Sequence, residues 1–127
     1  MSISYFDNEP NRTWPRRAQQ IWQILISYAS NKQLITYGAL ADIIGFGGAG
    51  VLAHPLGHIM NYCQENKVPP LTAIVINQET GAPGVGLTAI QEYDDSLDLA
   101  RIDVFYYAWY KLVPPTIEDY ESVGDGW

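Results

Sequence analysis

In this chain of 127 residues, the side chains that are best spaced for chemistry lie along a predicted helix at residues 52–64 and on the residue that directly follows it. Four polar residues recur there at i, i+4, i+7 and i+11: His54, His58, Asn61 and Glu65. In a helix these positions share one face, and we expect that face to point outward. It could form hydrogen bonds to a nucleic acid or a protein, although many such faces are only solvated. His54 and His58 also have the spacing of a metal-binding pair, but no third ligand stands at a recognisable spacing, so we predict no metal.

The elements that position this face run from residue 35 to residue 77. Thr36 is the expected N-cap of a short helix ending at Ile44, and a glycine-rich turn follows at residues 45–50. The polar helix comes next, with Pro55 in the first turn, where proline is tolerated. Residues 71–76 are apolar and β-branched enough for a buried strand. The pattern predicts a helix-turn-helix at residues 36–65 and a β wing at residues 71–86.

Apolar residues at helical spacing predict where these helices meet a core. On a helix that begins near Thr13, the apolar stripe is Ala18, Ile21, Trp22, Leu25, Tyr28 and Ala29. The short helix at residues 36–44 should turn Leu40, Ile43 and Ile44 inward, and the polar helix should bury Leu52, Leu56, Ile59 and Cys63. The chain should therefore be mainly helical with a small β wing.

The second half of the chain is harder to assign. Five apolar residues roughly follow a helical period over residues 97–112: Leu99, Ile102, Phe105, Trp109 and Leu112. A strand over residues 104–110 stays open, because aromatic residues alternate there as well. Residues 114–127 form an acidic tail that is either mobile or packed through Tyr120 and Trp127. We therefore expect a single winged-helix domain over residues 1–113, followed by that tail.

The charge of this chain is unevenly distributed around a net value of −7. Residues 1–71 hold five basic and four acidic residues, whereas residues 72–127 hold two basic and ten acidic residues. Nucleic acid would therefore meet the first half, where Arg16, Arg17, Lys32 and Lys67 are the candidate phosphate contacts. The absence of a long apolar run or a signal-like N-terminus predicts a cytoplasmic protein without a membrane partner.

One stretch of the sequence is similar to a known family. The run ITYGALADIIG is followed by a glycine turn, an AxxLG helix, an asparagine, a proline and a valine-rich strand. This order resembles the C-terminal winged-helix domain of the O6-alkylguanine-DNA alkyltransferases and the alkyltransferase-like proteins, over about residues 33–86. The resemblance implies a winged helix that contacts DNA, with Tyr37 beside a flipped nucleotide.

The same resemblance implies that the reaction of the family is missing. Its arginine finger matches His54, and its reactive PCHRV motif aligns best with residues 70–74, which places Leu71 at the cysteine position. Alkyl transfer needs a thiolate beside a base, so Leu71 cannot serve. The one cysteine, Cys63, lies on the inner stripe of its helix and reads as a small buried hydrophobe. No other catalytic set and no cofactor site emerges.

The predicted function is therefore non-enzymatic DNA binding. Tyr37, His54, His58, Asn61 and the wing would hold DNA, assisted by the four basic side chains named above. The alternative is a winged helix used for protein contact, in which the acidic second half meets a basic nucleic-acid-binding partner or mimics DNA. A third reading, an enzyme that uses His54 and His58, would require a bound metal.

Overall fold

The computed structural model describes residues 13–45, 52–77 and 97–124 of the chain. Its elements are α1 (Thr13–Ser30), β1 (Ile35–Thr36), α2 (Tyr37–Ile44), α3 (Ala53–Glu65), η4 (Leu71–Ile74), β2 (Val75–Ile76), α5 (Leu97–Tyr106), η5 (Trp109–Lys111) and α6 (Ile117–Val123). The prediction of a mainly helical chain with a small amount of β structure is confirmed. The glycine turn beyond Gly45, the distal wing at residues 78–86 and Trp127 lie outside the described residues.

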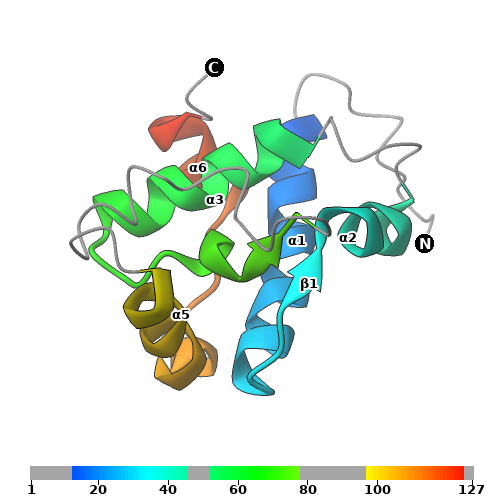
Figure 1. The fold of residues 1–127 in the computed structure, drawn as a ribbon. Helices are drawn as coiled ribbons and strands as arrows, with labels where there is room; N and C mark the ends of the chain where they lie inside the picture. Colours follow the sequence, from blue (N-terminus) through cyan, green and yellow to red (C-terminus); the bar gives the residue numbers. More distant parts are fainter. Residues whose placement is uncertain (1–12, 46–51, 78–96, 125–127) are drawn as a thin grey trace.

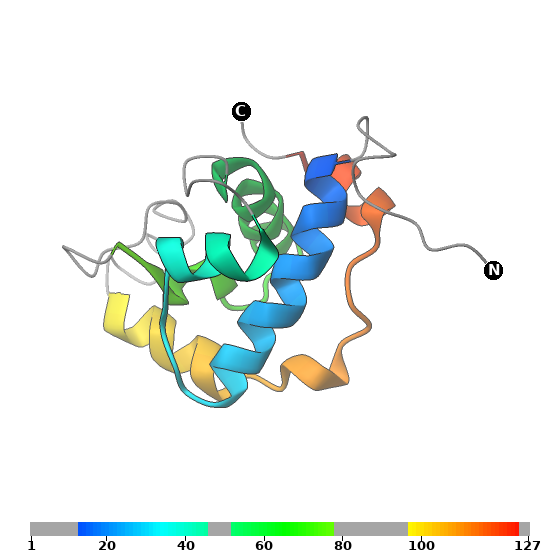
Figure 2. The same ribbon diagram turned by 90° about the vertical axis from the view of Figure 1, so that its right-hand side faces the viewer.

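Helix α1 is the central element, and the other helices pack around it (Figures 1 and 2). Its apolar stripe forms as predicted: five of its six residues are buried and Tyr28 is half-buried. The indole rings of Trp22 and Trp109 meet edge to face, with centroids 5.5 Å apart. Trp109 donates its ring N–H to the Val104 carbonyl at 2.7 Å, so its one polar atom is satisfied in the core.

The two helices predicted to form the helix-turn-helix are present. The Thr36 hydroxyl accepts a hydrogen bond from the Ala39 amide at 3.1 Å, which confirms it as the N-cap of α2. Gly45 ends α2 with φ +80°, a backbone conformation that favours glycine because it has no Cβ. Helix α3 buries Leu52, Leu56, Ile59 and Cys63 completely, as its spacing predicted.

The predicted strand over residues 71–76 is wrong for its first four residues. Leu71–Ile74 form the 3₁₀ helix η4, and only Val75–Ile76 extend into β2. β2 pairs with β1 in parallel, Ile35 opposite Val75 and Thr36 opposite Ile76. The segment is buried, as expected. Its apolar run shows no alternation between buried and exposed residues, so the sequence pattern could not distinguish a strand from a helical turn.

The helix predicted over residues 97–112 is wrong at its C-terminal end and in the face it buries. α5 stops at Tyr106, and η5 follows after a break. α5 buries the small residues Ala100 and Val104, while Leu99 and Ile102 are exposed. Short side chains let α5 approach the core closely, so the larger ones are left on the solvent side.

The predicted acidic tail contains helix α6, which packs against α3 and α1. Thr116 and Asp119 form a reciprocal capping box at its start. Tyr120 is fully buried, so the segment packs through this residue, one of the two arrangements expected. The rest of α6 places Glu118, Asp119 and Glu121 at the surface.

Candidate functional site

The polar face of α3 is covered by α6, so the prediction of an outward face is wrong for His58. His58 is only 7% exposed, and its Nδ1 lies 2.8 Å from the Tyr120 carbonyl oxygen. Because a carbonyl only accepts, the proton of this hydrogen bond belongs to Nδ1. Asn61 donates to the Gly124 carbonyl at 3.1 Å. Both side chains thus bind the backbone of α6, which a helical wheel of α3 could not reveal.

His54 lies at the other end of the same face, where α1 and α3 begin. Its ring stacks on the indole of Trp14, with centroids 5.0 Å apart and planes inclined by 15°. His54 is half-buried in this position. The three residues predicted to share one binding face therefore have three different environments: a ring stack, a buried hydrogen bond and a half-buried amide.

A polar hollow of about 440 Å³ remains between α3 and α6. It is lined by Asn61, Gln64, Glu65 and Val123. Asn61 and Glu65 belong to the predicted face, so part of that face still borders solvent. A lining with amides and one carboxylate offers hydrogen bonds but no positive charge for phosphate.

The four predicted phosphate contacts are not brought into one patch. Arg16 and Arg17 lie near the beginning of α1, and Lys32 follows its end, so about 20 Å of helix separates Lys32 from the two arginines. Arg17 donates to the Ile44 carbonyl at 3.2 Å, at the end of α2, where a cation complements the helix dipole. Lys32 lies over the Tyr106 ring, its Nζ 4.7 Å from the centroid. Lys67 follows the end of α3 on the exposed surface.

The positions matched to the alkyltransferase reaction are part of the core or next to it. Leu71, in η4, is fully buried, and Tyr37 begins α2 half-buried against the core. Burial raises the pKa of the Cys63 thiol to about 12, and a hydrogen bond with the Leu71 backbone opposes this rise. The thiol is therefore protonated near neutral pH, as expected for a structural cysteine.

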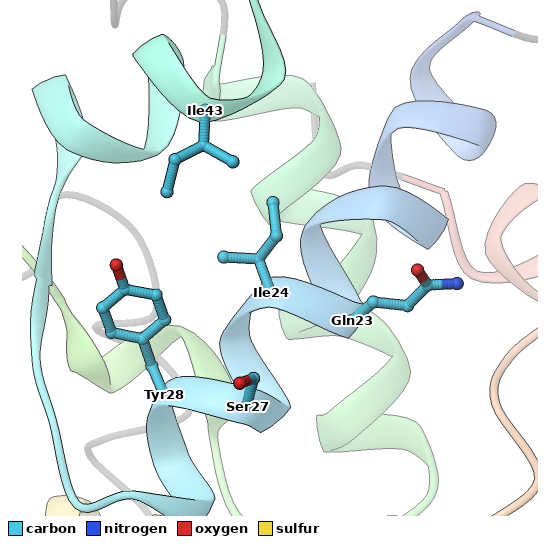
Figure 3. A pocket seen from close by; sticks show the side chains of 5 residues that line it. All are labelled: Gln23, Ile24, Ser27, Tyr28 and Ile43. Atoms are coloured by element: carbon cyan, nitrogen blue, oxygen red, sulfur yellow. The ribbon is translucent and has the colours of Figure 1, made fainter.

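The surface feature that the sequence did not predict is a shallow apolar groove of about 350 Å³ between α1 and α2 (Figure 3). Its lining consists of Gln23, Ile24, Ser27, Tyr28 and Ile43. Ile43 was expected to face inward, but it is 52% exposed. The small Ala41 is buried beside Leu40 instead, which turns Ile43 away from the core. The sequence signal for an exposed Ile43 was the presence of three bulky apolar residues on a helix as short as α2. On this helix Ile43 lies well away from the side that carries the buried Leu40 and Ala41.

Residues 13–45, 52–77 and 97–124 offer neither a metal-binding cluster nor a membrane-spanning helix. These residues contain no group of three or more His, Cys, Asp or Glu side chains that could hold a metal ion. Within the same ranges, each helix is too short or too polar to cross a membrane.

The comparisons with known proteins add no relative. No protein-family model, no curated protein and no solved structure matches this chain. The fold and the surface thus define a small, mainly helical protein with a parallel pair of two-residue strands, an apolar groove between α1 and α2, and a polar helix face covered by an acidic helix.

Proposed function

We propose that this protein is a non-enzymatic protein-binding module on a winged-helix scaffold similar to that of the alkyltransferase DNA-binding domain. The observation that carries the proposal is the cover over α3. His58 and Asn61, which would meet DNA, bind the backbone of α6 instead. The groove between α1 and α2 is apolar and open, and it can receive an apolar side chain of a partner.

The scaffold part of the proposal is supported by the helix pair α2 and α3. Thr36 caps α2, Gly45 ends it, and α3 follows with its apolar side in the core. Of the predicted wing strand at residues 71–76, the last two residues are extended, as the short strand β2. These features agree with the order of elements on which the resemblance rests.

Charge favours a protein over DNA as the partner. α6 places Glu118, Asp119 and Glu121 at the surface beside α3. A nearby carboxylate repels phosphate, whereas DNA affinity depends on neutralising phosphates with Lys and Arg. An acidic surface instead suits a basic protein surface.

Affinity capture from a nuclease-treated lysate tests the proposal. A defined protein partner should be captured in nearly equal amounts from nuclease-treated and untreated lysate, because its binding does not depend on nucleic acid. Ile43→Asp should abolish capture, since it places a carboxylate in the apolar groove. Val113→Asp is the matched control, because it places the same charge at an exposed apolar residue outside the groove, and this variant should capture normally. Co-purification that nuclease removes would contradict the proposal.

A second candidate, DNA binding, is favoured by one observation. The stacked rings of Trp14 and His54 join the beginnings of α1 and α3, and Arg16 and Arg17 lie near that beginning of α1. Helix N-termini carry partial positive charge and attract phosphate. DNA contact would then use His54, Arg16, Arg17 and Tyr37, whereas His58 and Asn61 would require α6 to move away.

A mobility-shift titration at low salt, with duplexes that contain guanine or O6-alkylated guanine, separates the two candidates. DNA binding predicts a shift that weakens in His54→Ala and in Arg16→Ala. If no shift occurs at tens of micromolar protein, this second candidate is wrong.

A further inference from the structure

Helix α5 turns a stripe of large apolar side chains to solvent. Leu99, Ile102 and Tyr106 follow one another at i, i+3 and i+7, and they are 55%, 50% and 72% exposed. The opposite side of the same helix is packed, because Ala100 and Val104 are fully buried. We call Leu99, Ile102 and Tyr106 the α5 stripe. Single exposed apolar residues need no explanation, but three in one row form a contact surface.

The charges around the α5 stripe have a defined arrangement. On a helical wheel, exposed Asp98 and Asp103 fall on opposite sides of the row. Arg101, also on α5, donates its Nε–H to the Ala73 carbonyl at 3.0 Å, which directs it toward η4, and Asp98 adds a favourable charge interaction to it. Lys32 covers the Tyr106 ring at the C-terminal end of the stripe. The apolar row is thus bordered by carboxylates along its length and by an ammonium group at one end.

We propose that the α5 stripe binds a basic amphipathic helix of a partner protein, an inference that rests on the protein-binding function proposed above. The apolar side of such a helix would cover Leu99, Ile102 and Tyr106. Its Lys or Arg side chains on either flank would reach Asp98 and Asp103. The match is one of charge as well as apolar contact, because the exposed carboxylates of Asp98 and Asp103 lie on either side of the apolar row.

The same charges disfavour the other occupants of such a surface. A second copy of this chain would bring carboxylates against carboxylates, and each copy carries a net charge of −7. DNA and anionic membranes present phosphates to Asp98 and Asp103, which is repulsive. A basic helix is the occupant for which both the apolar row and the carboxylates along its two sides are favourable.

The test uses the full chain and two synthetic amphipathic peptides of about 18 residues, five helical turns. One contains leucine and lysine, and its twin replaces each lysine with glutamate. Fluorescence anisotropy should show the lysine peptide binding at least tenfold more tightly than the glutamate twin. Ile102→Asp should weaken the lysine peptide at least tenfold, as expected when a central contact is lost. Since this variant adds negative charge, a purely electrostatic attraction would instead be strengthened.

The matched control is Val113→Asp, which also replaces an exposed β-branched residue with aspartate but lies outside both α5 and the groove. It should bind the lysine peptide within about twofold of the unsubstituted chain. The double variant Asp98→Asn, Asp103→Asn should weaken binding severalfold and flatten its dependence on salt, because two charge contacts are removed. Circular dichroism verifies that each variant is folded.

Several outcomes would overturn this inference. They are equal binding of both peptides, equal loss of binding in Ile102→Asp and Val113→Asp, no binding to the folded chain, and dimerisation that Ile102→Asp abolishes in sedimentation. The lysate capture separates this failure from failure of the protein-binding proposal. If Ile43→Asp abolishes capture and Ile102→Asp leaves it unchanged, the partner binds the groove and not the α5 stripe. The α5 inference then fails while the proposed function stands. If no protein is captured, both fail.

Discussion

Replacing Tyr120 with alanine removes the side chain that joins α6 to the rest of the protein. Tyr120 is fully buried, and its ring lies 6.2 Å from His58 and 5.9 Å from Tyr62, between centroids. Removing a buried aromatic side chain lowers the free energy of unfolding by about 3–5 kcal/mol. The His58 hydrogen bond is made to the Tyr120 backbone, so it is not itself removed. The cost therefore measures the packing of the side chain.

The assay is urea unfolding followed by circular dichroism, together with a thermal scan. A loss of 3–5 kcal/mol should lower Tm by about 12–20 °C, at roughly 4 °C per kcal/mol for a chain of this size. Such a loss is a large part of the roughly 5–15 kcal/mol that stabilises a typical domain. Tyr110→Ala is the matched control, because Tyr110 is 67% exposed and should change stability by no more than about 0.5 kcal/mol.

A third variant separates the ring from its hydroxyl. The Tyr120 hydroxyl is buried without a hydrogen-bond partner among the described residues, so Tyr120→Phe should be neutral or stabilising by about 1 kcal/mol. If Tyr120→Ala costs less than about 1 kcal/mol, then α6 is not part of the cooperative core. In that case α6 would not stably cover His58 and Asn61 on α3.

Three further predictions concern single side chains. Thr72 is fully buried and its hydroxyl has no hydrogen-bond partner among the described residues. Thr72→Val should therefore raise the free energy of unfolding by up to about 1–2 kcal/mol, which a higher urea midpoint would show. Cys63 should not react with a thiol reagent at pH 8 until urea unfolds the chain. Because burial raises the pKa of Cys63 in the folded chain to about 12, the free energy of unfolding should fall as the pH rises from about 9 toward 12. Cys63→Ala should reduce the slope of this pH dependence. Lys67 has φ +57°, a left-handed conformation that costs a lysine about 1–2 kcal/mol, so Lys67→Gly should stabilise by about 0.5 kcal/mol in the same urea assay.

The resemblance to the alkyltransferase domain leads to different expectations once α6 is in place. The match at Tyr37, Gly38, Leu40, Ala41 and Gly57 concerns residues that build α2 and α3, and these helices form where expected. The outcome differs for His58 and Asn61, which were predicted to face DNA, because both are hydrogen-bonded to a segment about 60 residues further along the chain. A local resemblance describes its own elements and is silent about what packs on them.

Interactions close in sequence explain why much of the fold could be predicted. The caps at Thr36 and Gly45 act within one helical turn, and the stripe of α1 follows from helical periodicity, so the sequence alone determined the two ends of α2 and the buried side of α1. Where two sets of residues could occupy the same contact, tertiary packing decided which set is buried. Ala100 and Val104 displaced Leu99 and Ile102 from the core, and α6 closed the polar face of α3. Those choices depend on the shapes of elements that meet only in the folded chain, so no local pattern in the sequence could record them.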